Sequence, residues 1–161
     1  MTSDTLGWGG AGLAGTMTVV GVIVAFVMAR FDIQYLNAGP SRLADLLISL
    51  WNIACFTALF WLAVYWRRKP EMHRRLMLLA TSMLMAPALA RFPQPFVFDY
   101  FYYWVDAAIL LGAARDLIVT RRIQMVYYCT LPVLIVGQLF VAHTVLTPSA
   151  WWMRIAGFLV R

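Results

Sequence analysis

The chain has 161 residues, a net charge of +6 at pH 7, 63% hydrophobic residues and only 12% charged residues. Soluble domains carry about 25% charged residues, so this chain has too little polar surface to coat a water-soluble globule. Its basic residues lie at the ends of apolar runs, where they would meet lipid headgroups. We therefore exclude nucleic acid as the partner and expect the lipid bilayer instead.

The apolar runs predict helices rather than a barrel. Backbone groups in hydrocarbon must hydrogen-bond within the chain, and long apolar runs without strict alternation favour helices. We predict an all-α fold, a polytopic membrane helical bundle that forms a single domain over residues 1–161. A spanning helix needs about 20 apolar residues. About five transmembrane helices are expected, near residues 6–29, 43–66, 72–91, 96–119 and 123–146, with a short C-terminal interfacial amphipathic helix over 149–161.

Small residues recur every four positions in the first expected span, in two series: Gly7, Ala11, Gly15 and Gly10, Ala14, Thr18. Such spacing lets two helix backbones approach closely. We therefore predict a helix-packing interface at Gly7, Gly10, Ala11, Ala14 and Gly15. Its partner is another helix of this chain, a second copy or a different membrane protein.

A basic segment, here called the basic knot (residues 67–75, RRKPEMHRR), separates the second and third expected spans. The positive-inside rule assigns such a cluster to a cytoplasmic loop. Two interpretations stay open. In the first, the knot only fixes topology. In the second, Arg67, Arg68, His73, Arg74 and Arg75 contact lipid headgroups or bind another anion.

The charge pattern predicts a cytoplasmic N-terminus and a C-terminus outside. With that orientation the inner side holds eight basic residues, namely Arg67, Arg68, Lys69, Arg74, Arg75, Arg115, Arg121 and Arg122. The outer side holds five, namely Arg30, Arg42, Arg91, Arg154 and Arg161. No cleavable signal peptide is expected, because Asp4 is present near the N-terminus and a positive leading region is missing.

Polar residues form a stripe on the fourth expected span. Asp99, Tyr102, Tyr103 and Asp106 are spaced i, i+3, i+4 and i+7, which places them on one helix face. An intramembrane carboxylate such as Asp106 costs about 2.5–3.5 kcal/mol. We expect Asp106 to be protonated or to pair with a cation, either Arg91 or Arg115. A structural acid that fixes helix register and a ligand or proton site both stay open.

The chain has few candidates for cofactor chemistry. His73 and His143 lie at opposite ends of two expected spans, and a span separates its ends by about 30 Å. The two histidines therefore cannot both bind one haem iron, and no cofactor, metal or catalytic residue is predicted. A haem held by one histidine is a lower-ranked alternative. The aromatics of residues 96–104 are expected to form an interfacial aromatic belt, and a quinone or pigment site among them is the lower-ranked alternative. Cys55 and Cys129 are expected to be small buried hydrophobic residues.

Residues 67–81 (RRKPEMHRRLMLLAT) and 90–93 (ARFP) resemble a signature, RRxPxxHRRLMLLAT…ARxP, of an uncharacterised family of bacterial multi-pass inner-membrane proteins. In that family the signature precedes a helix that holds an Asp and a pair of arginines before the last span. Asp106 and Arg121-Arg122 match this continuation. The resemblance covers the chain from about residue 43 onward. It implies a helical fold in the bacterial inner (cytoplasmic) membrane and no established reaction.

These observations favour a small non-catalytic integral membrane protein, an accessory or structural subunit of a larger membrane complex of the respiratory or photosynthetic kind. Its partners would be the bilayer and other membrane subunits, or a second copy. Two alternatives are kept. One is a redox protein that binds haem, quinone or pigment, and the other is a small proton-coupled transporter that uses Asp106.

Overall fold

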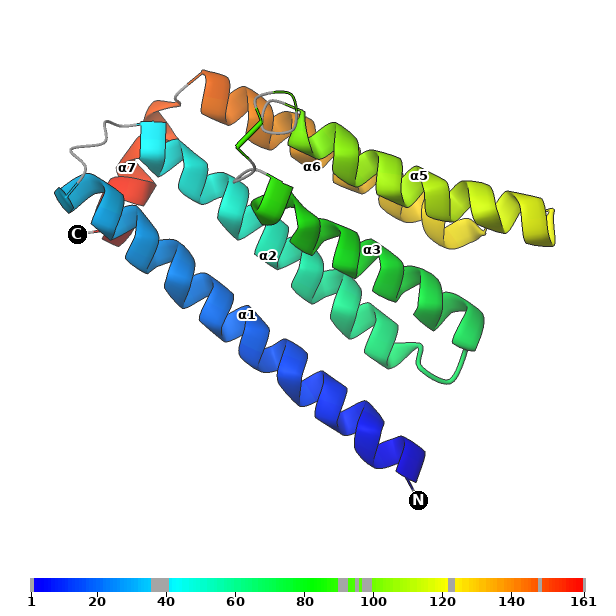
Figure 1. Cartoon of the computed structure of the whole chain (residues 1–161). Coiled ribbons are helices and arrows are strands. Elements are labelled where there is room, and N and C mark those ends of the chain that lie inside the picture. The colour runs from blue at the N-terminus through cyan, green and yellow to red at the C-terminus, as the bar shows by residue number, and fades with distance from the viewer. Residues whose placement is uncertain are drawn as a thin grey trace. The chain divides into compact units, whose positions relative to one another are not determined.

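The computed structural model describes residues 2–35, 41–89, 93–94, 96, 100–121, 124–147 and 149–160 (Figure 1). Within these residues the chain is all-helical and contains no strand, which confirms the predicted fold class. The helices are α1 (Thr2–Tyr35), α2 (Ser41–Tyr65), α3 (Pro70–Leu89), α5 (Phe101–Thr120), α6 (Met125–Leu146) and α7 (Ala150–Val160). Each of the predicted segments coincides with one of these helices.

Among the residues that the structure describes, three helices are long and apolar enough to cross a membrane, fewer than the five that the sequence predicts. They are α1 over Gly12–Phe31, α2 over Asp45–Tyr65 and α6 over Met125–Leu146. The other two long helices, α3 and α5, differ because they carry charged residues within their length. The length of the apolar runs alone therefore predicted all five helices to be membrane spans.

The chain divides into two compact units, residues 1–53 with 137–161 and residues 54–136. Both α2 and α6 run across the division, so each of these helices contributes one half to each unit. The single domain over the whole chain stays a prediction. The two units are described separately below.

The first unit has its core where α1, α2 and α7 meet. Ala29, Leu46, Trp152 and Ala156 are buried there. Trp152 and Ala156 lie four residues apart on one face of α7, whereas Trp151 and Phe158 on the same helix are exposed. The predicted terminal helix is therefore present, and one of its faces is buried in protein. Its interfacial position stays a prediction.

A close contact joins the two halves of α2 and α6 that belong to the first unit. A Cβ atom added at Gly137 would lie 1.9 Å from Cζ2 of Trp51. The indole ring therefore packs directly on the backbone of α6, and only glycine fits at this position.

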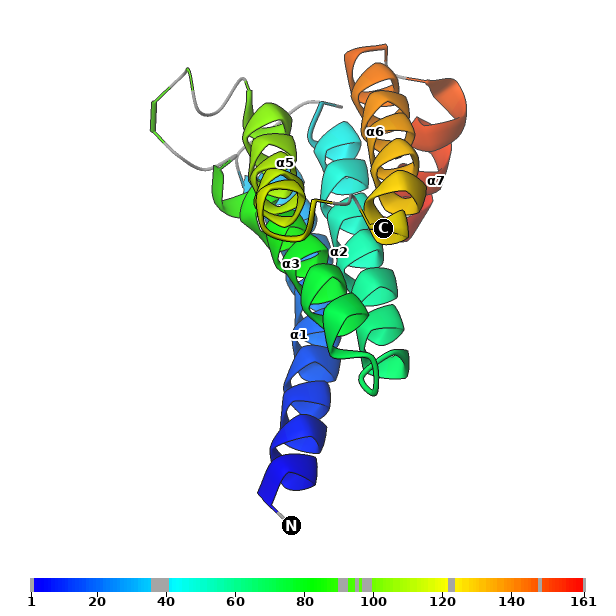
Figure 2. The same ribbon diagram turned by 90° about the vertical axis from the view of Figure 1, so that its right-hand side faces the viewer.

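The second unit is built around α3 and α5, which lie side by side (Figure 2). The buried face of α3 includes Leu76, Leu79, Ala80, Met83 and Ala86, and Val105 and Ile109 of α5 are fully buried. Small side chains on these faces allow the two helices to approach closely. A Cβ atom added at Gly112 of α5 would lie 2.7 Å from Cδ2 of Leu78, which shows the same close packing.

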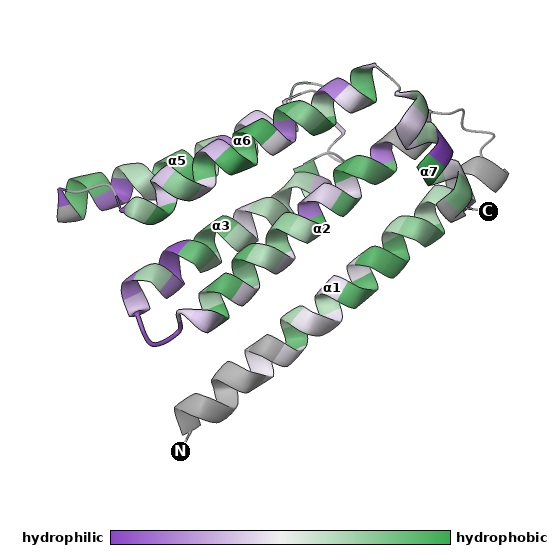
Figure 3. Ribbon diagram, turned by 180° about the vertical axis from the view of Figure 1, so that it is seen from behind, coloured by the Kyte–Doolittle hydropathy of each residue, from purple (hydrophilic) through white to green (hydrophobic). Residues whose placement is uncertain are grey.

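The turn between α2 and α3 is tight and hydrophilic (Figure 3). Pro70 begins α3, the position at which its missing N–H costs nothing. The Lys69 carbonyl accepts from the N–H groups of Met72 and His73, both at 3.0 Å. Nδ1 of His73 lies 2.8 Å from the Ala63 carbonyl, and because a carbonyl only accepts, Nδ1 carries the proton. His73 thus ties α3 to α2.

Candidate functional site

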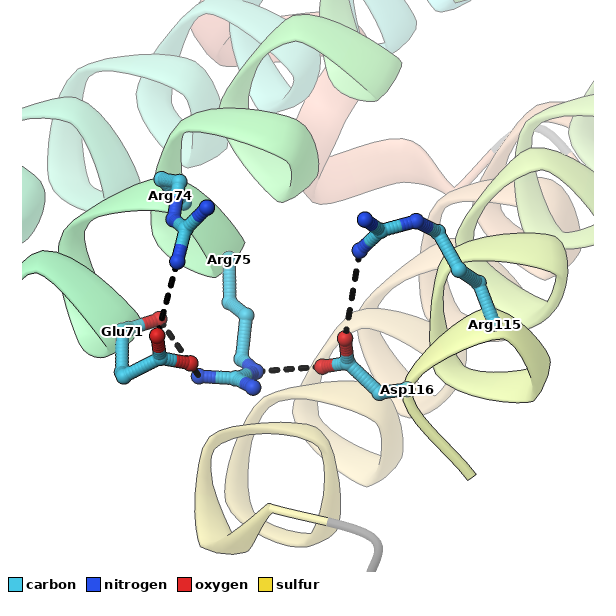
Figure 4. Close-up of polar contacts among 5 residues, drawn as sticks. All are labelled: Glu71, Arg74, Arg75, Arg115 and Asp116. Carbon is cyan, nitrogen blue, oxygen red and sulfur yellow. Dashed lines mark hydrogen bonds and ion pairs between the residues drawn. The ribbon is translucent and has the colours of Figure 1, made fainter. Parts of the chain in front are cut away.

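Charged side chains of α3 and α5 meet across a cleft in the second unit (Figure 4). Glu71, Arg74 and Arg75 project from the first turns of α3, and Arg115 and Asp116 project from α5. The cleft has a volume of about 310 Å³ and is also lined by Leu78, Gly112, Val119 and Tyr127. We call it the arginine cleft.

Arg75 and Asp116 form the buried base of the arginine cleft. Their side chains are 6% and 8% exposed. Nε of Arg75 donates to Oδ2 of Asp116, and Nη1 contacts the Glu71 carbonyl oxygen at 2.6 Å and Oε2 of Glu71 at 2.9 Å. The guanidinium is therefore held from both sides by protein acceptors. Removal of either residue would deprive the other buried charge of its buried partner.

Arg74 and Arg115 form the rim of the arginine cleft. Nη2 of Arg74 lies 2.7 Å from Oε1 of Glu71, and Nη1 of Arg115 lies 3.7 Å from Oδ1 of Asp116. These two arginine side chains are 70% and 73% exposed, so water screens their ion pairs. Hydrogen bonds from Arg75 and Arg74 lower the pKa of the exposed Glu71 carboxyl below its ordinary value. Glu71 is therefore ionised at neutral pH.

The structure divides the predicted anion-contact residues of the basic knot into two groups. Arg67 and Arg68 are exposed in the turn and do not line the cleft. Arg74 and Arg75 lie on α3 and line it. His73 is half-buried and faces α2 through its bond to the Ala63 carbonyl.

The predicted polar stripe of α5 is described only in part, and as a ligand or proton site it stays a prediction. Asp99 and Arg91 lie outside the described residues. Tyr102 and Asp106 are half-buried, whereas Tyr103 is 71% exposed. Arg115, one of the two predicted partners of Asp106, lies beside Asp116 instead.

Asp116 is the site residue that the sequence analysis missed. A signal for it was present in the predicted topology, because alternating spans place the start of segment 72–91 and the end of segment 96–119 at the same membrane face. Arg75 and Asp116 lie at those two ends. Because the two residues have opposite charges and are expected at the same depth in the membrane, the buried pair could have been predicted.

On the small-residue face of α1, the two glycines whose surroundings are described are open, whereas Ala14 is buried. A Cβ atom added at Gly10 or Gly15 would have no described atom within 4 Å. Ala14 is buried at 6% exposure. Gly7 and Ala11 lie within α1, but their surroundings lie outside the described residues.

Aromatic rings gather at the start of α5. Phe96 lies 5.8 Å from Tyr100 and 5.6 Å from Trp104 between ring centroids, and Tyr100 lies 5.7 Å from Tyr103. All four side chains are exposed, as in an interfacial belt.

Of the two cysteines, Cys55 is buried but Cys129 is exposed, so the prediction for Cys129 was wrong. Cys129 lies on an outward face of α6, a difference that hydropathy alone does not reveal.

In the part of the chain that the structure describes, no group of three or more His, Cys, Asp or Glu side chains could hold a metal ion. Comparisons of the chain with protein-family models, curated proteins and solved structures found no match. The candidate sites therefore rest on their own geometry.

Proposed function

We propose that the chain is a small non-catalytic integral membrane protein that serves as an accessory subunit of a larger membrane complex. The observation that carries this proposal is the open small-residue face of α1. An accessory subunit needs a surface on which another membrane helix can pack closely, and glycine-rich helix faces provide such surfaces in lipid.

The surroundings of α1 support this role. Gly9, Gly10, Gly12 and Gly15 have no described atom within 4 Å of an added Cβ. A hollow of about 330 Å³ lined by Val22, Ile23, Phe26, Val27 and Arg30 continues along the helix. Val22 follows Gly15 by seven residues, so the hollow lies on the same face of α1 as Gly15. We assign this face to a helix of a different membrane protein.

Five spans, with the N-terminus in the cytoplasm and the C-terminus outside, are part of the proposal. The charges of α3 and α5 make them poor spans when each is considered alone. Arg75 and Asp116 neutralise each other between the two helices, which lowers the cost of placing them in the membrane together. The resemblance to bacterial multi-pass inner-membrane proteins supports the inner membrane as the location.

The experiment is purification of the tagged full chain in a mild detergent from the organism that encodes it. Gly15→Leu should remove a stoichiometric membrane partner, because a large side chain blocks close helix approach. Gly157→Leu is the matched control, since Gly157 on α7 also has no described atom within 4 Å. The unchanged chain running as a stable monomer would contradict the proposal, and so would equal partner loss in both variants.

A further inference from the structure

We propose that the arginine cleft binds the phosphate group of an anionic phospholipid. The cleft presents three guanidinium groups against two carboxylates, which leaves it with a net positive charge. Guanidinium groups match phosphate oxygens in geometry and bind them through charge-assisted hydrogen bonds.

Arg75 is fixed in position before any ligand arrives. Its Nε and Nη1 atoms are used by Asp116 and Glu71, whose acceptors hold the guanidinium in one orientation. A guanidinium has five N–H donors, and within the described residues its Nη2 has no hydrogen-bond partner. Arg75 therefore offers Nη2 to a ligand without losing its own contacts.

The two rim arginines can reach a phosphate from opposite walls. Arg74 comes from α3 and Arg115 from α5 (Figure 4), and both side chains are largely exposed. Their existing ion pairs are exposed and therefore weak, so a bound phosphate would cost little when it replaces them. The three arginines would then surround one anion.

The apolar lining of the cleft favours a lipid over free phosphate. Leu78, Gly112 and Val119 form part of the wall beside the charged groups. A phospholipid brings an apolar glycerol and chain region next to its phosphate, whereas inorganic phosphate has nothing to place there. A volume of about 310 Å³ suits a headgroup and not a whole lipid. The predicted topology places the arginine cleft near the cytoplasmic leaflet, which is rich in anionic lipids.

The proposal is tested by measuring lipid binding to the purified full chain in detergent with native mass spectrometry. The probes are dioctanoyl phosphatidylglycerol, dioctanoyl phosphatidylcholine and inorganic phosphate. The unchanged protein should retain phosphatidylglycerol in preference to phosphatidylcholine. Arg74→Gln and Arg115→Gln should each raise the dissociation constant for phosphatidylglycerol roughly tenfold, because each removes one charge-assisted hydrogen bond.

The matched control is Arg68→Gln, which removes the same charge from an exposed residue of the basic knot outside the cleft. It should change the dissociation constant by less than about twofold. Both rim variants leave Arg75 and Asp116 in place, and unchanged thermal unfolding would show that they fold. Equal weakening by Arg68→Gln, or equal binding of phosphatidylcholine, would overturn the proposal. Displacement of the lipid by an equal concentration of inorganic phosphate would also overturn it and identify free phosphate as the ligand.

Discussion

The guanidinium of Arg75 connects the first turns of α3 to α5 through the Asp116 carboxylate, and Glu71 of α3 holds it from the other side. Because Arg75 and Asp116 are almost fully buried, neither charge has water as an alternative partner. Each depends on the other, and the exposed Glu71 supplies the remaining acceptors. This arrangement differs from the rim, where water can replace a lost partner.

Removal of one member of the buried pair should destabilise the protein far more than removal of a rim charge. We expect Arg75→Met or Asp116→Leu to lower the free energy of unfolding by about 3–5 kcal/mol, because each removes the buried partner of a buried charge. The double variant should recover much of this loss, since apolar side chains then meet in the same space. Unfolding in detergent measures all three. Arg74→Met is the exposed control, and a loss in Arg75→Met no larger than in that control would contradict a structural role for the pair.

The packing of α2 against α6 depends on Gly137, which neither helix length nor hydropathy identifies in the sequence. Gly137→Ala should lower the free energy of unfolding by about 1–3 kcal/mol, because the new Cβ atom would overlap the ring of Trp51. Gly157→Ala is the control, since it meets no described atom within 4 Å and gains up to about 1 kcal/mol of helix propensity. Thermal unfolding in detergent compares them. If both variants were equally stable, the contact between Gly137 and Trp51 would not exist.

The positions of the helices could be predicted, whereas their packing partners could not. Apolar run length placed α2 and α6 well, because a bilayer requires helices of about 20 residues whatever their neighbours are. The pairing of α3 with α5 depends on which faces meet, and composition carries no such information. Asp116 was missed because Arg115 beside it was weighed as a partner of Asp106. Its partner Arg75 lies 41 residues away in sequence.

For the whole molecule, the question is whether α3 and α5 cross the bilayer. Of the described helices, three are apolar enough to span it by themselves, and α3 and α5 carry the charges of the arginine cleft. With three spans, the connection between α3 and α5 would stay on the cytoplasmic side. With five, it would lie outside, and the arginine cleft would lie near the cytoplasmic leaflet. Only the second arrangement makes the chain the five-span subunit that we propose.

The most direct test is the membrane side of Gln94, an exposed residue in the connection between α3 and α5. Gln94→Cys and, as the inner control, Arg68→Cys would be made in a chain in which both native cysteines, Cys55 and Cys129, are replaced by alanine. A membrane-impermeant maleimide is then added to intact spheroplasts. Five spans predict labelling of Gln94→Cys at once and of Arg68→Cys only after permeabilisation. Protection of Gln94→Cys until permeabilisation would contradict the five-span account.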